Sequence, residues 1–163
     1  MRARIRSTRL VTASAEVSAI PCLERAKKGS LMRVFIADDS EVVAERLKTM
    51  LSELPGIEIA GQARDAPEAT KSILETEPDV VILDIRMPMG SGIEVLREIK
   101  QRKTATTVIM LTNYPYPQYR KRCLDAGADF FLDKSGEFNK IIGILEKLLE
   151  SSSQSSVPEK EES

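Results

Sequence analysis

The segment that decides the fold runs from Val80 to Gly92 and reads Val-Val-Ile-Leu-Asp-Ile-Arg-Met-Pro-Met-Gly-Ser-Gly. It opens with an unbroken apolar run, which is typical of a parallel strand covered on both faces. Asp84 ends this strand, and Ser91 is placed to cap a helix. Apolar residues then recur with helical spacing at Ile93, Leu96 and Ile99. The segment therefore predicts a strand, a loop that starts with a carboxylate, and a helix.

The same alternation continues on both sides of this segment. Strand-length apolar runs lie at residues 34–37, 57–60, 80–83, 108–111 and 130–132. A stretch of helical period follows each run, near residues 43–54, 69–74, 93–99, 119–124 and 141–149. Strands that alternate with helices in this way favour a parallel sheet. We therefore predict an α/β fold: a doubly wound (βα)5 unit with an open, parallel, five-stranded sheet of the flavodoxin type.

This pattern occupies residues 32–150, which we assign to one domain. The first 30 residues carry seven Lys or Arg and no sustained apolar period, so we expect residues 1–31 to form a flexible basic arm. An alternative is that the natural start is Met32, with the arm upstream of it. Residues 151–163 are rich in Ser and Glu and contain no aromatic residue, so we expect a disordered tail.

The composition excludes several classes of function. The chain has no histidine, which rules out histidine-based triads and a role as a phosphohistidine donor. A net charge of -1 provides no general attraction to nucleic acid or to anionic membranes. The longest apolar runs are far below the roughly 20 residues needed to span a bilayer, so no membrane insertion is expected. Cys22 and Cys123 match no metal or disulfide spacing, which favours a cytoplasmic protein.

Five polar residues follow the predicted strands directly: Asp38, Asp39, Asp84, Thr112 and Lys134. Each alone has an ordinary explanation, such as helix capping, a turn or a solvated lysine. In a doubly wound sheet, however, the carboxyl ends of the strands meet at one edge, where ligands bind. Clustered carboxylates repel one another, and oxygen ligands without histidine or thiolate favour Mg²⁺. We therefore expect a phosphoryl-transfer site, with Asp84 as a carboxylate nucleophile and Lys134 as a counter-charge.

These residues resemble a known family. Asp38-Asp39, the segment from Asp84 to Gly92, Thr112 and the stretch 127–134 (Gly-Ala-Asp-Phe-Phe-Leu-Asp-Lys) are similar, in order and spacing, to the receiver domain of two-component response regulators. The resemblance covers about residues 32–150.

The resemblance implies a role for each site residue. Asp84 is the phosphorylation site, and Asp38, Asp39 and Asp84 bind Mg²⁺ together with the backbone carbonyl of Arg86. Lys134 and Thr112 contact the phosphoryl group. Phe131 occupies the position of the family's switch aromatic, and we expect it to fill the space that the Thr112 hydroxyl leaves on phosphorylation.

The resemblance also implies partners. A sensor histidine kinase or a histidine phosphotransfer protein supplies the phosphoryl group, and an unknown downstream protein reads the result. Because 13 residues follow Glu150, we expect a stand-alone receiver with no output domain and no turnover activity. Two alternatives are a relay intermediate that passes the phosphoryl group onward and a receiver-like scaffold that is never phosphorylated. Oligomeric states compatible with the sequence are a monomer and a phosphorylation-dependent dimer.

The chain departs from the family pattern at two positions. Ser135 follows Lys134 where many receivers have proline, commonly after a cis peptide, so we expect a trans bond and a more adaptable loop. The switch residue is Phe131 rather than tyrosine, so its ring cannot donate a hydrogen bond to a partner.

A tyrosine-rich loop follows Thr112. Tyr114 and Tyr116 alternate with prolines, which favour extended backbone and outward rings, and Arg120 adds positive charge nearby. We expect Tyr114, Tyr116 and Arg120 to form a partner surface, whereas the alternative is a solvated helix face. Arg86 and Tyr114 also flank the expected path of the water that hydrolyses an aspartyl phosphate, so we expect slow dephosphorylation.

Two other functions match single features of the sequence. A phosphatase of the haloacid dehalogenase kind also uses a strand-end aspartate, but it places a second aspartate two residues later, where this chain has Arg86. A nucleic-acid binder would use the basic arm and the basic run 120–122. No helix-turn-helix pattern follows residue 150, so direct DNA binding is not expected.

Overall fold

The computed structural model describes residues 31–102 and 105–155. The predicted arm at residues 1–30 and the end of the tail at 156–163 lie outside these ranges. Within them the main sheet has five parallel strands in the order β2-β1-β3-β6-β7. The strands are β1 (Met32–Ala37), β2 (Ile57–Ala63), β3 (Val80–Leu83), β6 (Thr107–Thr112) and β7 (Phe130–Asp133). The predicted doubly wound (βα)5 fold is therefore confirmed.

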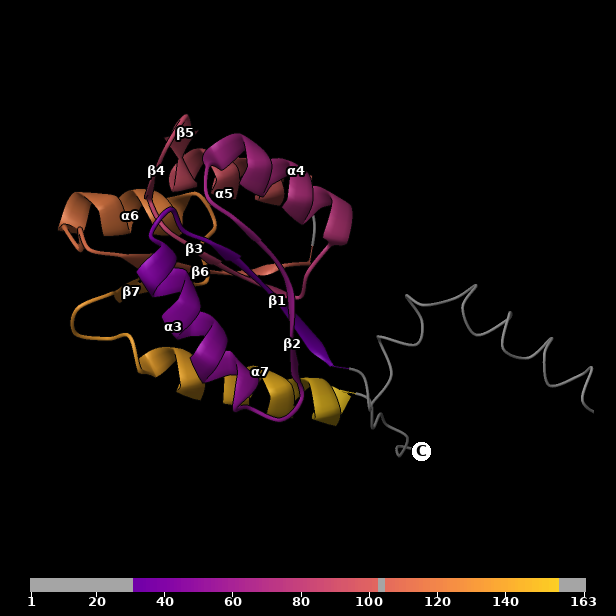
Figure 1. Cartoon of the computed structure of the whole chain (residues 1–163). Helices are drawn as coiled ribbons and strands as arrows, with labels where there is room; N and C mark the ends of the chain where they lie inside the picture. Colours follow the sequence, from indigo (N-terminus) through magenta and orange to yellow (C-terminus); the bar gives the residue numbers. More distant parts are fainter. Residues whose placement is uncertain (1–30, 103–104, 156–163) are drawn as a thin grey trace, which may run out of the picture. The chain divides into compact units, whose positions relative to one another are not determined.

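Helices cover both faces of this sheet (Figure 1). One face is covered by α3 (Glu41–Ser52) and α7 (Lys140–Ser155), and the other by α4 (Ala66–Thr76), α5 (Gly92–Gln101) and α6 (Pro117–Asp125). Successive strand residues point to opposite faces, so each face has its own apolar core. This explains why the run 80–83 is apolar at every position: all four of its residues are buried.

The helices begin where local side-chain chemistry permits. Ser40 caps α3 by accepting from the Val43 N–H at 3.3 Å, and Ser91 caps α5 by accepting from the Glu94 N–H at 3.3 Å. Asp65 caps α4 through the Glu68 N–H at 2.8 Å. In contrast, α6 has no side-chain cap and fully buries one residue, Cys123. Of the five helices described, α6 is the one with the smallest buried face.

Two details differ from the prediction. A short antiparallel pair, β4 (Arg86–Met87) and β5 (Gly90–Ser91), lies inside the loop after β3. In addition, α7 continues to Ser155, so the tail predicted to be disordered from Ser151 begins as helix. Extending an existing helix costs much less than nucleating one, which is why serines can continue it. None of the described helices is long and apolar enough to cross a membrane.

Candidate functional site

The site lies where the order of the strands reverses. Along the sheet, β1 is flanked by β2 and β3, so the chain winds outward in both directions from the β1–β3 pair. Asp38 follows β1, and its N–H donates to the Ala63 carbonyl at 3.1 Å. Asp84 follows β3, and its N–H donates to the Ala37 carbonyl at 2.9 Å. The backbone of the sheet thus places these two aspartates beside each other at the topological switch point.

Three carboxylates gather at this edge. One oxygen from each of Asp38, Asp39 and Asp84 lies within 4.8 Å of the other two. Asp38 and Asp84 are buried, whereas Asp39 is exposed. The donor set is all oxygen, with one open side, which fits a hard divalent cation such as Mg²⁺ that keeps several waters.

Lys134 reaches into this cluster from the end of β7. Its N–H donates to the Thr112 carbonyl at 2.8 Å, which continues the pairing of β6 with β7. Its ammonium Nζ lies 2.7 Å from Asp38 Oδ2 and 3.2 Å from Asp84 Oδ2. Burial opposes the charge on Lys134, but the hydrogen bond to Asp38 and the charges of both aspartates outweigh it and raise the pKa of the lysine. Lys134 is therefore a fixed positive charge between two buried carboxyl groups.

The Asp84 carboxyl has a perturbed affinity for protons. Its pKa is raised from the ordinary 3.8 to about 6, mainly by burial and in smaller part by the charge of Asp38. The charge of Lys134, its hydrogen bond and a backbone hydrogen bond from Arg86 act in the opposite direction. Without a cation the site disfavours the ionised form of Asp84, and a bound cation would favour it.

The loop after Asp84 is held by close backbone packing. The Gly92 N–H donates to the Ile85 carbonyl at 2.7 Å. A Cβ atom at Gly92 would lie 1.9 Å from the Asp84 carbonyl oxygen, so no side chain fits there. Met89 and Gly90 have φ angles of 63° and 151° and make the turn between β4 and β5. The glycines of this motif thus allow α5 to start directly against the aspartate.

The predicted switch residues lie at the ends of β6 and β7. Thr112 is fully buried, and its Oγ1 accepts from the Tyr114 N–H at 2.9 Å. Its hydroxyl proton can still be donated to a phosphoryl oxygen. Phe131 points into the core, with the exposed Arg120 guanidinium 4.8 Å above its ring. Sequence reasoning placed Arg120 on a partner surface but did not detect this contact, because it joins α6 to β7 only in the folded chain.

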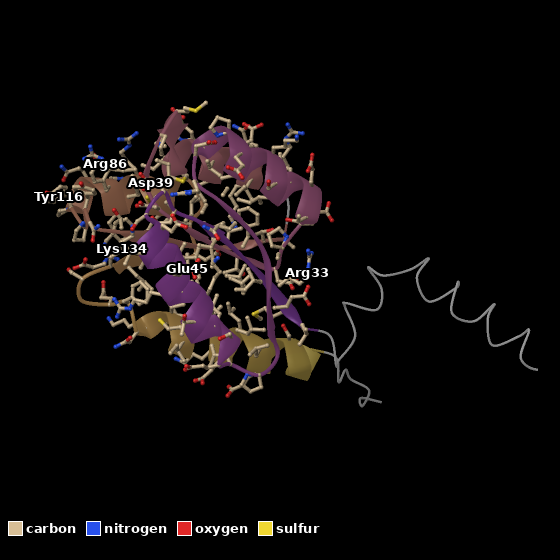
Figure 2. All side chains as sticks on the ribbon, in the orientation of Figure 1. Arg33, Asp39, Glu45, Arg86, Tyr116 and Lys134 are labelled. Atoms are coloured by element: carbon tan, nitrogen blue, oxygen red, sulfur yellow. The ribbon has the colours of Figure 1, made fainter. Side chains whose placement is uncertain are left out.

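The three tyrosines form a connected row beside the site. The Arg86 guanidinium lies 4.6 Å from the centre of the Tyr114 ring. The centre of the Tyr116 ring lies 6.3 Å from that of Tyr114 and 6.0 Å from that of Tyr119. Tyr116 is half exposed, Tyr114 is partly buried, and Tyr119 packs against the core. Figure 2 shows Arg86, Asp39, Lys134 and Tyr116 at the same end of the molecule, far from Arg33.

Sequence reasoning missed the bonds that shape the loop after Lys134. Asp133 Oδ1 accepts from both the N–H and the hydroxyl of Ser135, each at 2.9 Å. Glu137 Oε2 accepts from the Asp133 N–H at 3.2 Å. The Lys134–Ser135 peptide is trans, as predicted. The signal that could have found these bonds is an acidic residue two positions before Ser135, a spacing typical of an Asx turn.

Comparison with known proteins identifies the family. The family model of the response regulator receiver domain matches residues 34–146. The chain belongs to this family. It is 36% identical over 117 residues to the uncharacterized transcriptional regulatory protein YvfU of Bacillus subtilis, covering 72% of the chain and 58% of YvfU. It is also 36% identical over 102 residues to the chemotaxis protein CheY of Halobacterium salinarum, covering 63% of the chain and 83% of CheY.

Crystal structures of receiver domains share the fold. The response regulator domain of Thermotoga maritima CheB aligns with a TM-score of 0.66 at 29% identity, covering 76% of this chain and 97% of that domain. CheY in the CheX–CheY–BeF₃–Mg²⁺ complex from Borrelia burgdorferi aligns with a TM-score of 0.66 at 29% identity, covering 72% and 88%. The chain nevertheless spans only part of several relatives, such as 30% of a protein-glutamate methylesterase/protein-glutamine glutaminase of Alkalilimnicola ehrlichii. What is established is thus a receiver domain of the two-component type.

Proposed function

We propose that this receiver accepts a phosphoryl group on Asp84 from a sensor histidine kinase or a histidine phosphotransfer protein, in the cytoplasm and with Mg²⁺. The observation that carries the proposal is the position of Lys134 Nζ, 2.7 Å from Asp38 and 3.2 Å from Asp84, beside the cluster of three carboxylates. A cationic group and a cation site next to one buried carboxylate are the requirements for phosphoryl transfer to that carboxylate.

Each site residue has a role in the proposed reaction. An Asp84 oxygen attacks phosphorus, and the bond from phosphorus to the donor nitrogen breaks, with its electron pair staying on the donor imidazole. Asp38, Asp39, Asp84 and the backbone carbonyl of Arg86 would hold Mg²⁺. When bound, this ion offsets the negative charge of the phosphoryl oxygens. Lys134 is already beside Asp84 and needs little movement to contact a phosphoryl oxygen.

The proposed response spreads from Thr112 to Phe131. A phosphoryl group adds roughly -1.5 to -2 charges and three acceptor oxygens. The Thr112 hydroxyl would move to donate to one of these oxygens, and Phe131 would fill the space that it leaves. Arg120 covers the Phe131 ring at 4.8 Å, so movement of this ring also changes the surface of α6. The small buried face of α6 makes this helix the element best able to adjust.

The proposed output is a protein surface next to this switch. Tyr116 is half exposed; its ring stacks on Tyr119 and is tilted against Tyr114, which gives an aromatic surface of low conformational entropy. Arg120 supplies positive charge at its border. We propose that an unknown downstream protein binds there, with the receiver either a monomer or a phosphorylation-dependent dimer. Direct DNA binding is not proposed: Arg120 lies over Phe131 and Lys121 pairs with Asp125 at 2.9 Å, so two residues of the basic run 120–122 already have partners.

We also propose no catalytic turnover, such as that of a phosphatase. The residue two positions after Asp84 is Arg86, which is exposed and stacked on Tyr114, and an arginine cannot act as a general acid and base there. We propose that this pair restricts the approach of water to Asp84, so the aspartyl phosphate should be long-lived. A long-lived phosphoryl group would equally serve a relay to another protein's histidine.

The test is labelling with a small phosphodonor. The purified chain is incubated with acetyl phosphate and Mg²⁺, and the phosphorylated fraction is measured by mass spectrometry. Labelling should require Mg²⁺, be absent in Asp84→Asn, and decay slowly after the donor is removed. Tyrosine fluorescence offers a second readout, because the chain has three tyrosines and no tryptophan.

Two outcomes would contradict parts of the proposal, and a third would favour its relay form. Failure of the wild type to label would favour a receiver-like scaffold that works without phosphorylation. Rapid loss of the phosphoryl group in water would contradict the shielding by Arg86 and Tyr114. Rapid loss only when a histidine phosphotransfer protein is added would identify a relay.

A further inference from the structure

The loop between β7 and α7 is bonded on both sides of Lys134. Before the lysine, the Asp133 N–H donates to Glu137 Oε2 at 3.2 Å, and the Glu137 N–H donates back to the Asp133 carbonyl at 2.8 Å. After the lysine, Asp133 Oδ1 accepts from the N–H and the hydroxyl of Ser135. Lys140 Nζ holds the other oxygen of Glu137 at 2.6 Å. The backbone around Lys134 is thus closed into a small hydrogen-bonded ring.

We propose that Asp133, Ser135 and Glu137 form a clamp that positions Lys134 for phosphoryl transfer. These three are positioning residues, since none of them contacts Asp84 in the described structure. The proposal deepens, and rests on, the proposed function of Asp84.

The position of β7 explains why a clamp is needed. This strand is the edge of the sheet beside β6, so within residues 31–102 and 105–155 no strand pairs with the outer side of its backbone. The inner side is paired, because the Lys134 N–H donates to the Thr112 carbonyl at 2.8 Å. Glu137 supplies the missing partner on the outer side by accepting from the Asp133 N–H. The last residue of the strand is therefore held from both sides.

The length of the lysine side chain explains why precision matters. Nζ is separated from the backbone by a four-carbon stem and must lie between two buried carboxyl groups. A small change in backbone direction at Lys134 would shift Nζ away from Asp84. In receivers with proline after the lysine, the ring itself restricts the loop. Here no ring fixes the φ angle of Ser135, and the hydrogen bonds that Ser135 donates to Asp133 restrict it instead.

The experiment compares Asp133→Ala with Asp133→Asn, which keeps an acceptor oxygen at the same place. The first readout is the initial rate of labelling by acetyl phosphate with Mg²⁺. The second is the reaction of Lys134 with acetic anhydride, followed by peptide mass spectrometry, with Lys100 as the internal reference. Lys100 is bonded to the Thr106 carbonyl and to Asp129, away from the clamp. Asp125→Ala is the matched control, because it removes an exposed aspartate that pairs with Lys121.

Asp133→Ala should label about tenfold more slowly. It loses the hydrogen bonds that Ser135 donates to Asp133, so Lys134 Nζ is held less firmly beside Asp84 when the phosphoryl group is transferred. Its Lys134 should react several times faster with the anhydride, because Nζ no longer stays between the carboxylates. Asp133→Asn and Asp125→Ala should resemble the wild type in both readouts. If Asp133→Ala fails to fold, Ser135→Ala removes one of the two bonds to Asp133 Oδ1 and should shift both readouts in the same direction.

Unchanged anhydride reactivity of Lys134 in Asp133→Ala would overturn the clamp, even if labelling slowed, since a merely structural effect would not act through the lysine. Absence of phosphorylation in the wild type would overturn the proposed function of Asp84. The anhydride reaction would still decide the clamp, because it needs neither donor nor metal.

Discussion

The two loops that carry the chemistry lead from a buried strand to a helix, but they are held by different forces. The loop from Asp84 to Gly92 is fixed by close packing of backbone on backbone, since a Cβ at Gly92 would lie 1.9 Å from the Asp84 carbonyl oxygen. The loop from Lys134 to Lys140 is fixed by hydrogen bonds that acidic side chains accept. A single added atom produces a clash where backbone packs on backbone. A lost hydrogen bond at an exposed loop can be replaced by a hydrogen bond to water. The two loops should therefore respond very differently to substitution.

Gly92→Ala is the strongest test of this difference. The added methyl group must displace the start of α5 or the Asp84 backbone, so the free energy of unfolding should fall by about 3 kcal/mol or more. Urea denaturation measures the loss, and phosphodonor labelling should fail in any folded fraction. Gly143→Ala on α7 is the control, because its Cβ meets no atom within 4 Å and alanine favours helix by up to about 1 kcal/mol. Equal effects at the two glycines would refute the steric account.

Lys134→Met removes the positive charge that the loop from Lys134 to Lys140 places in the site. It leaves Asp38 and Asp84 buried without their shared positive charge, which should cost about 3 kcal/mol in the absence of divalent cations. Mg²⁺ supplies charge at the same place, so saturating Mg²⁺ should recover part of this loss. Thermal unfolding with and without Mg²⁺ checks this. A loss that is the same with and without Mg²⁺ would argue against a cation site next to the lysine.

Asp84→Asn should raise the free energy of unfolding, whereas Lys134→Met lowers it. The pKa of Asp84 is about 6 in the folded chain against 3.8 ordinarily, so the folded state binds more protons between these values. The free energy of unfolding therefore falls as the pH rises from about 4 to 6, and above pH 6 the full cost of about 3 kcal/mol is present. Asparagine removes this cost. Without metal, the variant should be more stable than wild type at pH 7.5, and the gap should close near pH 4. A gap that does not vary with pH would contradict the shifted pKa.

Arg46→Ala should give the smallest effect. The Arg46 guanidinium lies 4.0 Å from the centre of the Phe138 ring, at the far end of the second loop. A cation–π contact at an exposed arginine contributes about 0.5 to 1 kcal/mol, and urea denaturation can resolve it. Lys48→Ala is the control, since it breaks an exposed ion pair with Glu45 that contributes about 0.3 kcal/mol. A larger effect at Lys48 than at Arg46 would mean that Phe138 anchors the loop without the arginine.

Prediction from the sequence was successful where a pattern is local. The run from Val80 to Leu83 was predicted as a strand with both of its ends correct, because burial on both faces requires an apolar residue at every position. Ser40 and Ser91 are caps in the structure, since a cap depends on a hydroxyl and the next turn of backbone. The short β4–β5 pair was missed because it depends on positive φ angles at Met89 and Gly90.

The sequence by itself determined the order of strands and helices, the cluster of aspartates at the strand ends and the exclusion of histidine chemistry. These follow from periodicity and composition, which need no knowledge of distant contacts. Only the tertiary structure decided that Lys134 bridges Asp38 and Asp84, that Arg120 covers Phe131, and that Arg86 stacks on Tyr114. Each of these contacts joins residues from different elements, and its energy exists only once the sheet has brought those elements within a few ångströms.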